Sequence, residues 1–154
     1  MDMRNKKLLD AVTQAMEIEK ETFDFYSAAE RKTFNPAGKR IFRWLAKSEE
    51  LHYLMMVELY RSLKDDGRWL SYGGSTIGLE LAGEGEPVVP FDADDRKGLE
   101  IALEIEKKAL AHFEELEANC SDSQGKEMFR TLILEEKEHG RLVMEKYGFL
   151  NCEW

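Results

Sequence analysis

Apolar residues recur every three or four positions along four stretches of the chain, at about residues 5–32, 37–64, 93–119 and 122–147. This spacing puts them on one side of an α-helix, so each stretch is expected to form a helix with one buried face. Asn35-Pro36 separates the first two stretches, because proline cannot continue a helix. Ser121 or Asp122 can cap the fourth. The pattern predicts an all-α four-helix bundle, with residues 1–154 forming a single domain.

The stretch at about residues 68–92 has no sustained period, is rich in glycine and contains two prolines. At about 3.3 Å per extended residue it can span the length of a helix of about 27 residues rising 1.5 Å each. We therefore expect one long crossover that lets the second and third helices run parallel. Its apolar segments, Trp69-Leu70 and Ile77 to Leu81, are expected to pack on the bundle or on a partner subunit.

The chain also repeats itself at an offset of 87 residues (Phe42 to Phe129). FRWLAKSEELH at residues 42–52 corresponds to FRTLILEEKEH at residues 129–139, and both copies end in Glu-x-x-His. AMEIEKETFDFY at residues 15–26 corresponds in the same register to ALEIEKKALAHF. The bundle is thus predicted to consist of two copies of one helical hairpin, related by a pseudo-two-fold axis.

Each buried face carries a carboxylate at its middle, and two faces also carry a histidine three residues later. The six residues are Glu19, Glu49, His52, Glu106, Glu136 and His139. Unpaired charge in a core is costly, whereas two divalent ions would neutralise four carboxylates. One Glu from each of two helices plus Glu-x-x-His from the other two is the ligand set of di-iron carboxylate bundles. Oxygen and imidazole ligands suit iron or manganese. The alternatives to metal ligation are that the glutamates are solvated and that the histidines are hydrogen-bonded in the core.

Several nearby polar residues lie off these faces. His112 is one position away and is expected at the surface or beside a ligand. The remaining glutamates near the motifs are expected to be solvated: Glu17, Glu21, Glu104, Glu135 and Glu138.

Net charge and cysteine content limit the kinds of partner and the cellular environment that are expected. The net charge is −9 and the pI is about 5.0, which disfavours nucleic acid and anionic membranes. Cys120 and Cys152 form neither a C-x-x-C motif nor a zinc pattern, so free thiols in a reducing cytoplasm are expected. No signal peptide and no membrane span are predicted.

The chain resembles the rubrerythrin branch of the ferritin-like superfamily. The residues that carry the resemblance are the core glutamates Glu19 and Glu106, the two Glu-x-x-His motifs, and Tyr26 seven positions after Glu19. The resemblance implies a ferritin-like bundle in which Glu49 and Glu136 bridge two metal ions. It implies terminal ligation by the other four residues. Tyr26 would then hydrogen-bond a ligand carboxylate, with core packing as the alternative.

The resemblance also implies function, with two departures. Rubrerythrins carry a four-cysteine rubredoxin domain, which these 154 residues do not contain, and a further glutamate where this chain has Ala109. We expect two iron ions (or manganese) and an oxidoreductase that reduces peroxide or dioxygen with an external electron donor, in a homodimer or larger homo-oligomer. A ferritin-like iron-storage protein with ferroxidase activity and a non-catalytic bundle stabilised by metal remain open.

Overall fold

Four long α-helices form the molecule in the computed structural model, which describes residues 3–34, 36–74 and 93–146. The helices are α1 (Met3–Lys32), α2 (Pro36–Asp65), α3 (Ala93–Asn119) and α4 (Ser123–Lys146). Their bounds differ from the predicted ones by a residue or two, and the described residues contain no strand. The predicted all-α, ferritin-like four-helix bundle is confirmed.

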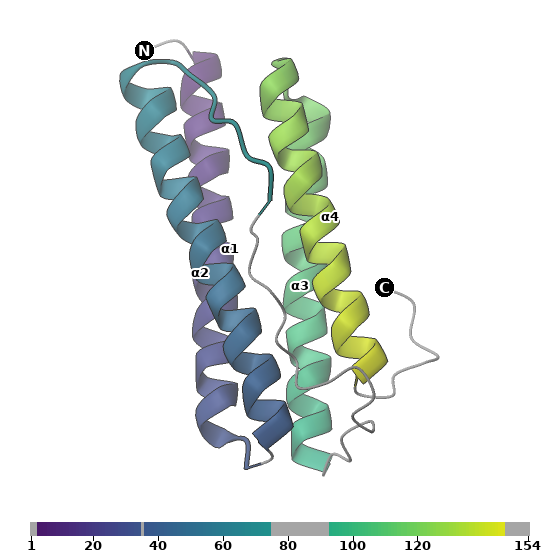
Figure 1. Cartoon of the computed structure of the whole chain (residues 1–154). Helices are drawn as coiled ribbons and strands as arrows, with labels where there is room; N and C mark the ends of the chain where they lie inside the picture. The colour runs from purple at the N-terminus through teal and green to yellow at the C-terminus, as the bar shows by residue number, and fades with distance from the viewer. Residues whose placement is uncertain (1–2, 35, 75–92, 147–154) are drawn as a thin grey trace.

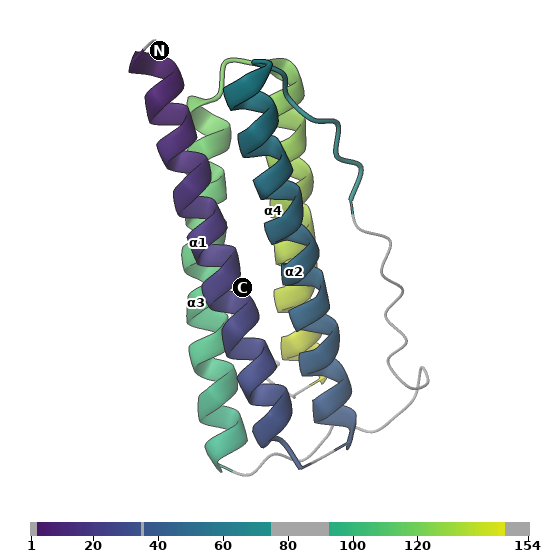
Figure 2. The ribbon, with the colours of Figure 1, turned by 90° about the vertical axis from the view of Figure 1, so that its left-hand side faces the viewer.

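The helices run in the order that a single long crossover requires. α1 is antiparallel to α2, α3 is antiparallel to α4, and α2 and α3 point the same way (Figure 1). α1 packs against α2 and α3, and α4 packs against the same two helices, so α2 and α3 lie diagonally across the bundle (Figure 2). The parallel course of α2 and α3 is therefore as predicted.

Local sequence explains where the helices begin and end. Pro36 opens α2, since the first helical position needs no N–H. Asp122 is the residue that caps α4: its Oδ1 accepts hydrogen bonds from the backbone N–H groups of Gln124 (2.9 Å) and Gly125 (3.0 Å). After α2, Gly67 adopts a left-handed conformation (φ 66°), which favours glycine and turns the chain out of the helix.

The first crossover residues pack on the bundle. Trp69 and Leu70 lie against one apolar cluster, and the Trp69 ring meets Phe129 edge-on with centroids 5.7 Å apart. Gly125 leaves room for this contact, because a Cβ there would lie 2.9 Å from the Trp69 ring and 2.6 Å from Cys120 Sγ. Cys120 is a buried free thiol. Ile77 to Leu81 and Cys152 lie outside the described residues.

The bundle interior is apolar towards both ends and polar in the middle. One apolar cluster contains Val12, Met56, Phe113 and Phe129. The other is built around Tyr26, Phe42, Leu45 and Ala102. In each helix the polar core positions fall between these two clusters in sequence, so apolar layers close the polar centre from both sides. No described helix is long and apolar enough to cross a membrane.

Candidate metal centre

The six residues singled out by the repeat meet in the middle of the bundle. Exposed fractions do not exceed 4% in the set Glu19, Glu49, His52, Glu106, Glu136 and His139. α1 and α3 each supply one glutamate, and α2 and α4 each supply a glutamate with a histidine one turn later. Because residues three apart share one helical face, each Glu and His pair projects to the same side.

These side chains form two overlapping groups. The first is Glu19, Glu49, His52 and Glu136, and the second is Glu49, Glu106, Glu136 and His139. Within each group, one ligand atom per residue lies within 4.8 Å of the others. Glu49 and Glu136 belong to both groups. The arrangement offers two adjacent cation positions joined by two shared carboxylates.

Both histidines turn Nδ1 towards the carboxylates. His52 Nδ1 lies 2.9 Å from Glu136 Oε1, 3.7 Å from Glu49 Oε2 and 3.8 Å from Glu19 Oε2. His139 Nδ1 lies 3.7 Å from Glu49 Oε1 and 3.8 Å from Glu136 Oε2. The two rings are nearly parallel, with centroids 5.8 Å apart. Each ring can thus present Nδ1 as a ligand to one of the two positions.

The outward nitrogens have hydrogen-bond partners that the sequence reasoning missed. His139 Nε2 lies 3.0 Å from the buried hydroxyl of Ser48, and His52 Nε2 lies 3.1 Å from Glu135 Oε2. The prediction that Glu135 is solvated is wrong: its side chain is 17% exposed and contacts the centre. Glu17, Glu21, Glu104 and Glu138 are exposed, as predicted.

Two aromatic residues complete the surroundings. The Tyr26 hydroxyl donates a 2.6 Å hydrogen bond to Glu106 Oε1, and its ring packs in an apolar cluster, so both alternatives for this residue hold. Trp44, for which no role was predicted, meets the His139 ring edge-on with centroids 4.8 Å apart. Both contacts join one hairpin to the other.

The crowded carboxylates have perturbed proton affinities. Burial, and then the charges of Glu49 and Glu136, raise the pKa of Glu19 well above its ordinary value. Burial and the same two charges also raise the pKa of Glu106. Burial would lower the pKa of His52, but four neighbouring carboxylates, Glu135 first and then Glu136, Glu19 and Glu49, raise it well above its ordinary value.

Glu49 differs from the other carboxylates. Burial alone would raise its pKa, but the polar groups of Glu19, His139 and His52 beside it bring the pKa well below its ordinary value. In the protein without metal, protons are therefore favoured on Glu19, Glu106 and His52, while Glu49 stays ionised. A centre of this kind can exchange protons for cations.

Buried atoms without partners show that the residues fit a metal. Among the described residues, no hydrogen bond reaches either carboxylate oxygen of Glu19, one oxygen each of Glu49, Glu106 and Glu136, or Nδ1 of His139. Buried polar atoms normally have partners, and leaving them without one costs free energy. All six atoms belong to residues of the two overlapping groups and are oxygen or imidazole nitrogen atoms, which hard or borderline cations take as ligands.

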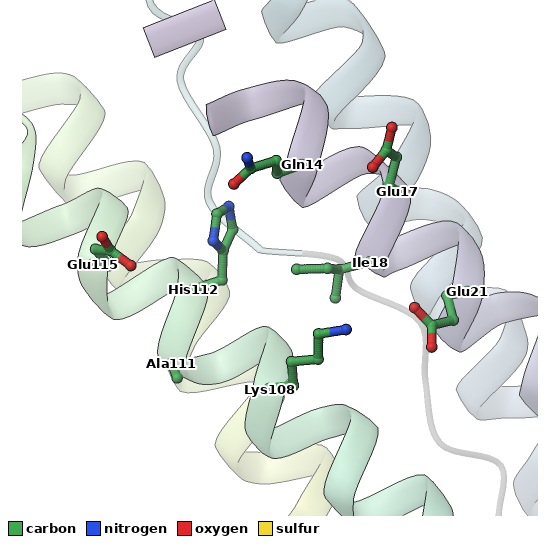
Figure 3. Close-up of a pocket in the computed structure, with 8 residues that line it drawn as sticks. All are labelled: Gln14, Glu17, Ile18, Glu21, Lys108, Ala111, His112 and Glu115. Carbon is green, nitrogen blue, oxygen red and sulfur yellow. The ribbon is translucent and has the colours of Figure 1, made fainter. Parts of the chain in front are cut away.

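His112 lies apart from this centre. Its Nε2 is 3.1 Å from the Ala11 carbonyl oxygen, so it ties α3 to α1. Figure 3 shows it in a surface groove between these helices, where Lys108 faces Ile18 and Glu21. The groove is lined by none of the six candidate ligands.

Comparison with known proteins agrees with this picture. The rubrerythrin family model matches residues 2–64, a span that contains α1 and all of α2 except its last residue. The predicted resemblance to rubrerythrins is thus confirmed for the first hairpin, and the internal repeat relates the second hairpin to it. No curated protein and no solved structure matches the chain.

Proposed function

We propose that this chain is a di-iron carboxylate oxidoreductase that reduces peroxide or dioxygen with electrons from an external donor. The observation that carries the proposal is the pair of overlapping ligand groups that share Glu49 and Glu136. Two ions held by shared carboxylates would lie close enough to act on one small oxidant together. The rubrerythrin match to α1 and α2 supports iron as the metal.

The chain's own residues then have distinct tasks. Glu49 and Glu136 would hold both ions, whereas Glu19 with His52 and Glu106 with His139 would each complete one position. The outer hydrogen bonds of both histidines keep the proton on Nε2, so that the Nδ1 lone pair points inward. The apolar clusters on either side exclude bulk water.

The redox chemistry would come from the bound metal: two ferrous ions supply two electrons, which with two protons convert one peroxide into two waters. The protein must deliver those protons to a buried site. The Tyr26 hydroxyl, which donates a hydrogen bond to Glu106, is a proton-bearing group at the carboxylates. We propose that turnover is completed by a separate electron donor that returns the centre to its reduced state.

Anaerobic iron loading followed by peroxide titration tests this function. We expect about two ferrous ions per chain. About one peroxide molecule per chain should then oxidise both ferrous ions, and the change in the visible spectrum measures this oxidation. Glu49→Ala and His139→Ala should lose most of the iron. Glu138→Ala should keep the iron, because Glu138 precedes His139 in the sequence but is exposed and forms an ion pair with Arg141.

The alternatives give different results. A large assembly that goes on accumulating iron far beyond two ions per chain would indicate storage. Iron that binds without reacting with peroxide or dioxygen would indicate a structural metal, and absence of iron binding would rule out the metal centre itself.

A further inference from the structure

The two hairpins hold each other's histidine through equivalent positions. Ser48 and Glu135 are related by the 87-residue offset, and each immediately precedes a shared glutamate. Ser48 of the first hairpin contacts His139 of the second, and Glu135 of the second contacts His52 of the first. The two contacts follow the pseudo-two-fold symmetry of the bundle, but the side chains differ: Ser48 offers a hydroxyl and Glu135 a carboxylate.

A carboxylate and a hydroxyl act differently on a ligand imidazole. With Nδ1 facing the metal position, Nε2 carries the proton and donates it to the outer partner. A charged acceptor makes the stronger hydrogen bond, about twice that of a neutral one. It also makes the imidazole a better electron donor to the metal. His52 has the charged partner and His139 the neutral one, so the Glu19–His52 position is favoured for a cation.

The two hairpins differ at a second pair of equivalent positions, Tyr26 and Phe113, and this difference affects the metal positions less. Tyr26 donates to Glu106, whereas its equivalent, Phe113, has no hydroxyl to offer Glu19. The tyrosine orients Glu106 but also draws charge away from that carboxylate, so its two effects on the Glu106–His139 position oppose each other. Glu135 both orients His52 and adds a negative charge, so its contribution is the larger one.

The crossover passes close to Glu135. A Cβ at Gly74 would lie 3.3 Å from Glu135 Oε1, so the crossover backbone passes directly over that carboxylate. The Tyr72 ring also meets the His52 ring edge-on, with centroids 6.3 Å apart. These contacts cover the side of the centre that carries the charged partner and limit the water that would screen it.

We infer that Glu135 and Ser48 are positioning residues that make the two metal positions unequal, with the Glu19–His52 position binding the tighter ion and filling first. The inference rests on the proposed metal centre but not on its catalytic role.

Calorimetric titration with Mn²⁺, followed in parallel by EPR, tests this inequality. The native protein should bind in two steps, the first at least about tenfold tighter. The first equivalent should give the EPR signal of an isolated ion, and the second should convert it to that of a coupled pair. Glu19→Ala should abolish the tight step, whereas its repeat counterpart Glu106→Ala should abolish only the weak one.

A second matched pair of variants tests Glu135 and Ser48, the hydrogen-bond partners of the two histidines. Glu135→Gln keeps an acceptor for His52 but removes the charge, and should weaken the first step about tenfold without changing the second. Ser48→Ala should weaken only the second step. Glu135 is partly exposed, so its variant isotherm decides the matter even if the Glu19→Ala protein does not fold.

The outcomes separate the two proposals. Two equal affinities in the native protein, together with equal losses of binding in Glu19→Ala and Glu106→Ala, would overturn the inequality. An unchanged isotherm in Glu135→Gln would overturn it as well. Both results would leave the proposed metal centre intact. Failure of the native protein to bind either manganese or iron would remove the metal centre, and the inequality with it.

Discussion

A buried carboxylate next to other buried carboxylates is stable only with compensating positive charge or bound protons. Glu19 illustrates this, since it is fully buried, has a raised pKa and has no hydrogen bond to either oxygen within the described structure. Helical periodicity was enough to predict its position in the core. A glutamate on an apolar helical face has few explanations, and a metal is the strongest of them.

Residues that act across the two hairpins could not be predicted in this way. Ser48 and Glu135 lie one position from the shared glutamates, and a helical pattern places them at the edge of the buried face. Whether such a residue faces solvent or a neighbouring helix depends on how the helices cross, which periodicity does not report. The repeat held a signal that was overlooked: if one of the two contacts a histidine, so should the other.

Tyr26 provides a test at the level of one hydroxyl group. Tyr26→Phe should lower the free energy of unfolding of the metal-free protein by about 1–3 kcal/mol, because Glu106 Oε1 would lose its buried partner. Denaturant unfolding measures this change. Tyr60→Phe is the control, since Tyr60 makes no hydrogen bond to another described residue. An equal effect in both variants would show that the hydrogen bond contributes nothing of its own.

At the level of elements, the two hairpins repeat contacts as well as sequence. Arg43 pairs with Glu30 at the end of the first hairpin, and Arg130 pairs with Glu117 at the equivalent place in the second. Lys39 and Lys126 donate to the carbonyl oxygens of the same two glutamates. The offset of 87 residues therefore predicted a structural symmetry, because equivalent side chains on equivalent helices meet equivalent neighbours.

The crossover was predicted only in part. Its length and lack of period correctly indicated that α2 and α3 run parallel (Figure 1). Its contact with the metal centre through Tyr72 and Gly74 was not foreseen, since an irregular segment has no period that tells which side chain faces the bundle. Tertiary packing decides this, and only the structure shows it.

For the whole molecule, the perturbed groups predict how stability depends on pH. Glu19, Glu106 and His52 have raised pKa values in the folded protein. Such groups stabilise the fold below their unfolded pKa values, and the stabilisation is lost as pH rises through the folded ones. Glu49, with its lowered pKa, acts in the opposite sense and only at acid pH. The metal-free protein should therefore lose stability from about pH 5 upward.

Thermal unfolding with and without chelator, over a series of pH values, measures this dependence. Metal replaces the bound protons, so its stabilising effect should grow with pH. Glu106→Gln should flatten the pH dependence of the metal-free protein, whereas Glu104→Gln, at an exposed position two residues away, should not. Rising stability of the metal-free protein over the same range would contradict the assignment of these pKa shifts to the buried centre.

In the proposed centre, two metal ions share Glu49 and Glu136 inside the bundle. Anomalous diffraction at the iron edge, from crystals of iron-loaded protein, tests it most directly. We predict two peaks about 3.5–4 Å apart, both between these glutamates, one beside His52 and the other beside His139. A single peak, or iron found only outside the four-helix core, would rule out a dinuclear centre held by Glu49 and Glu136.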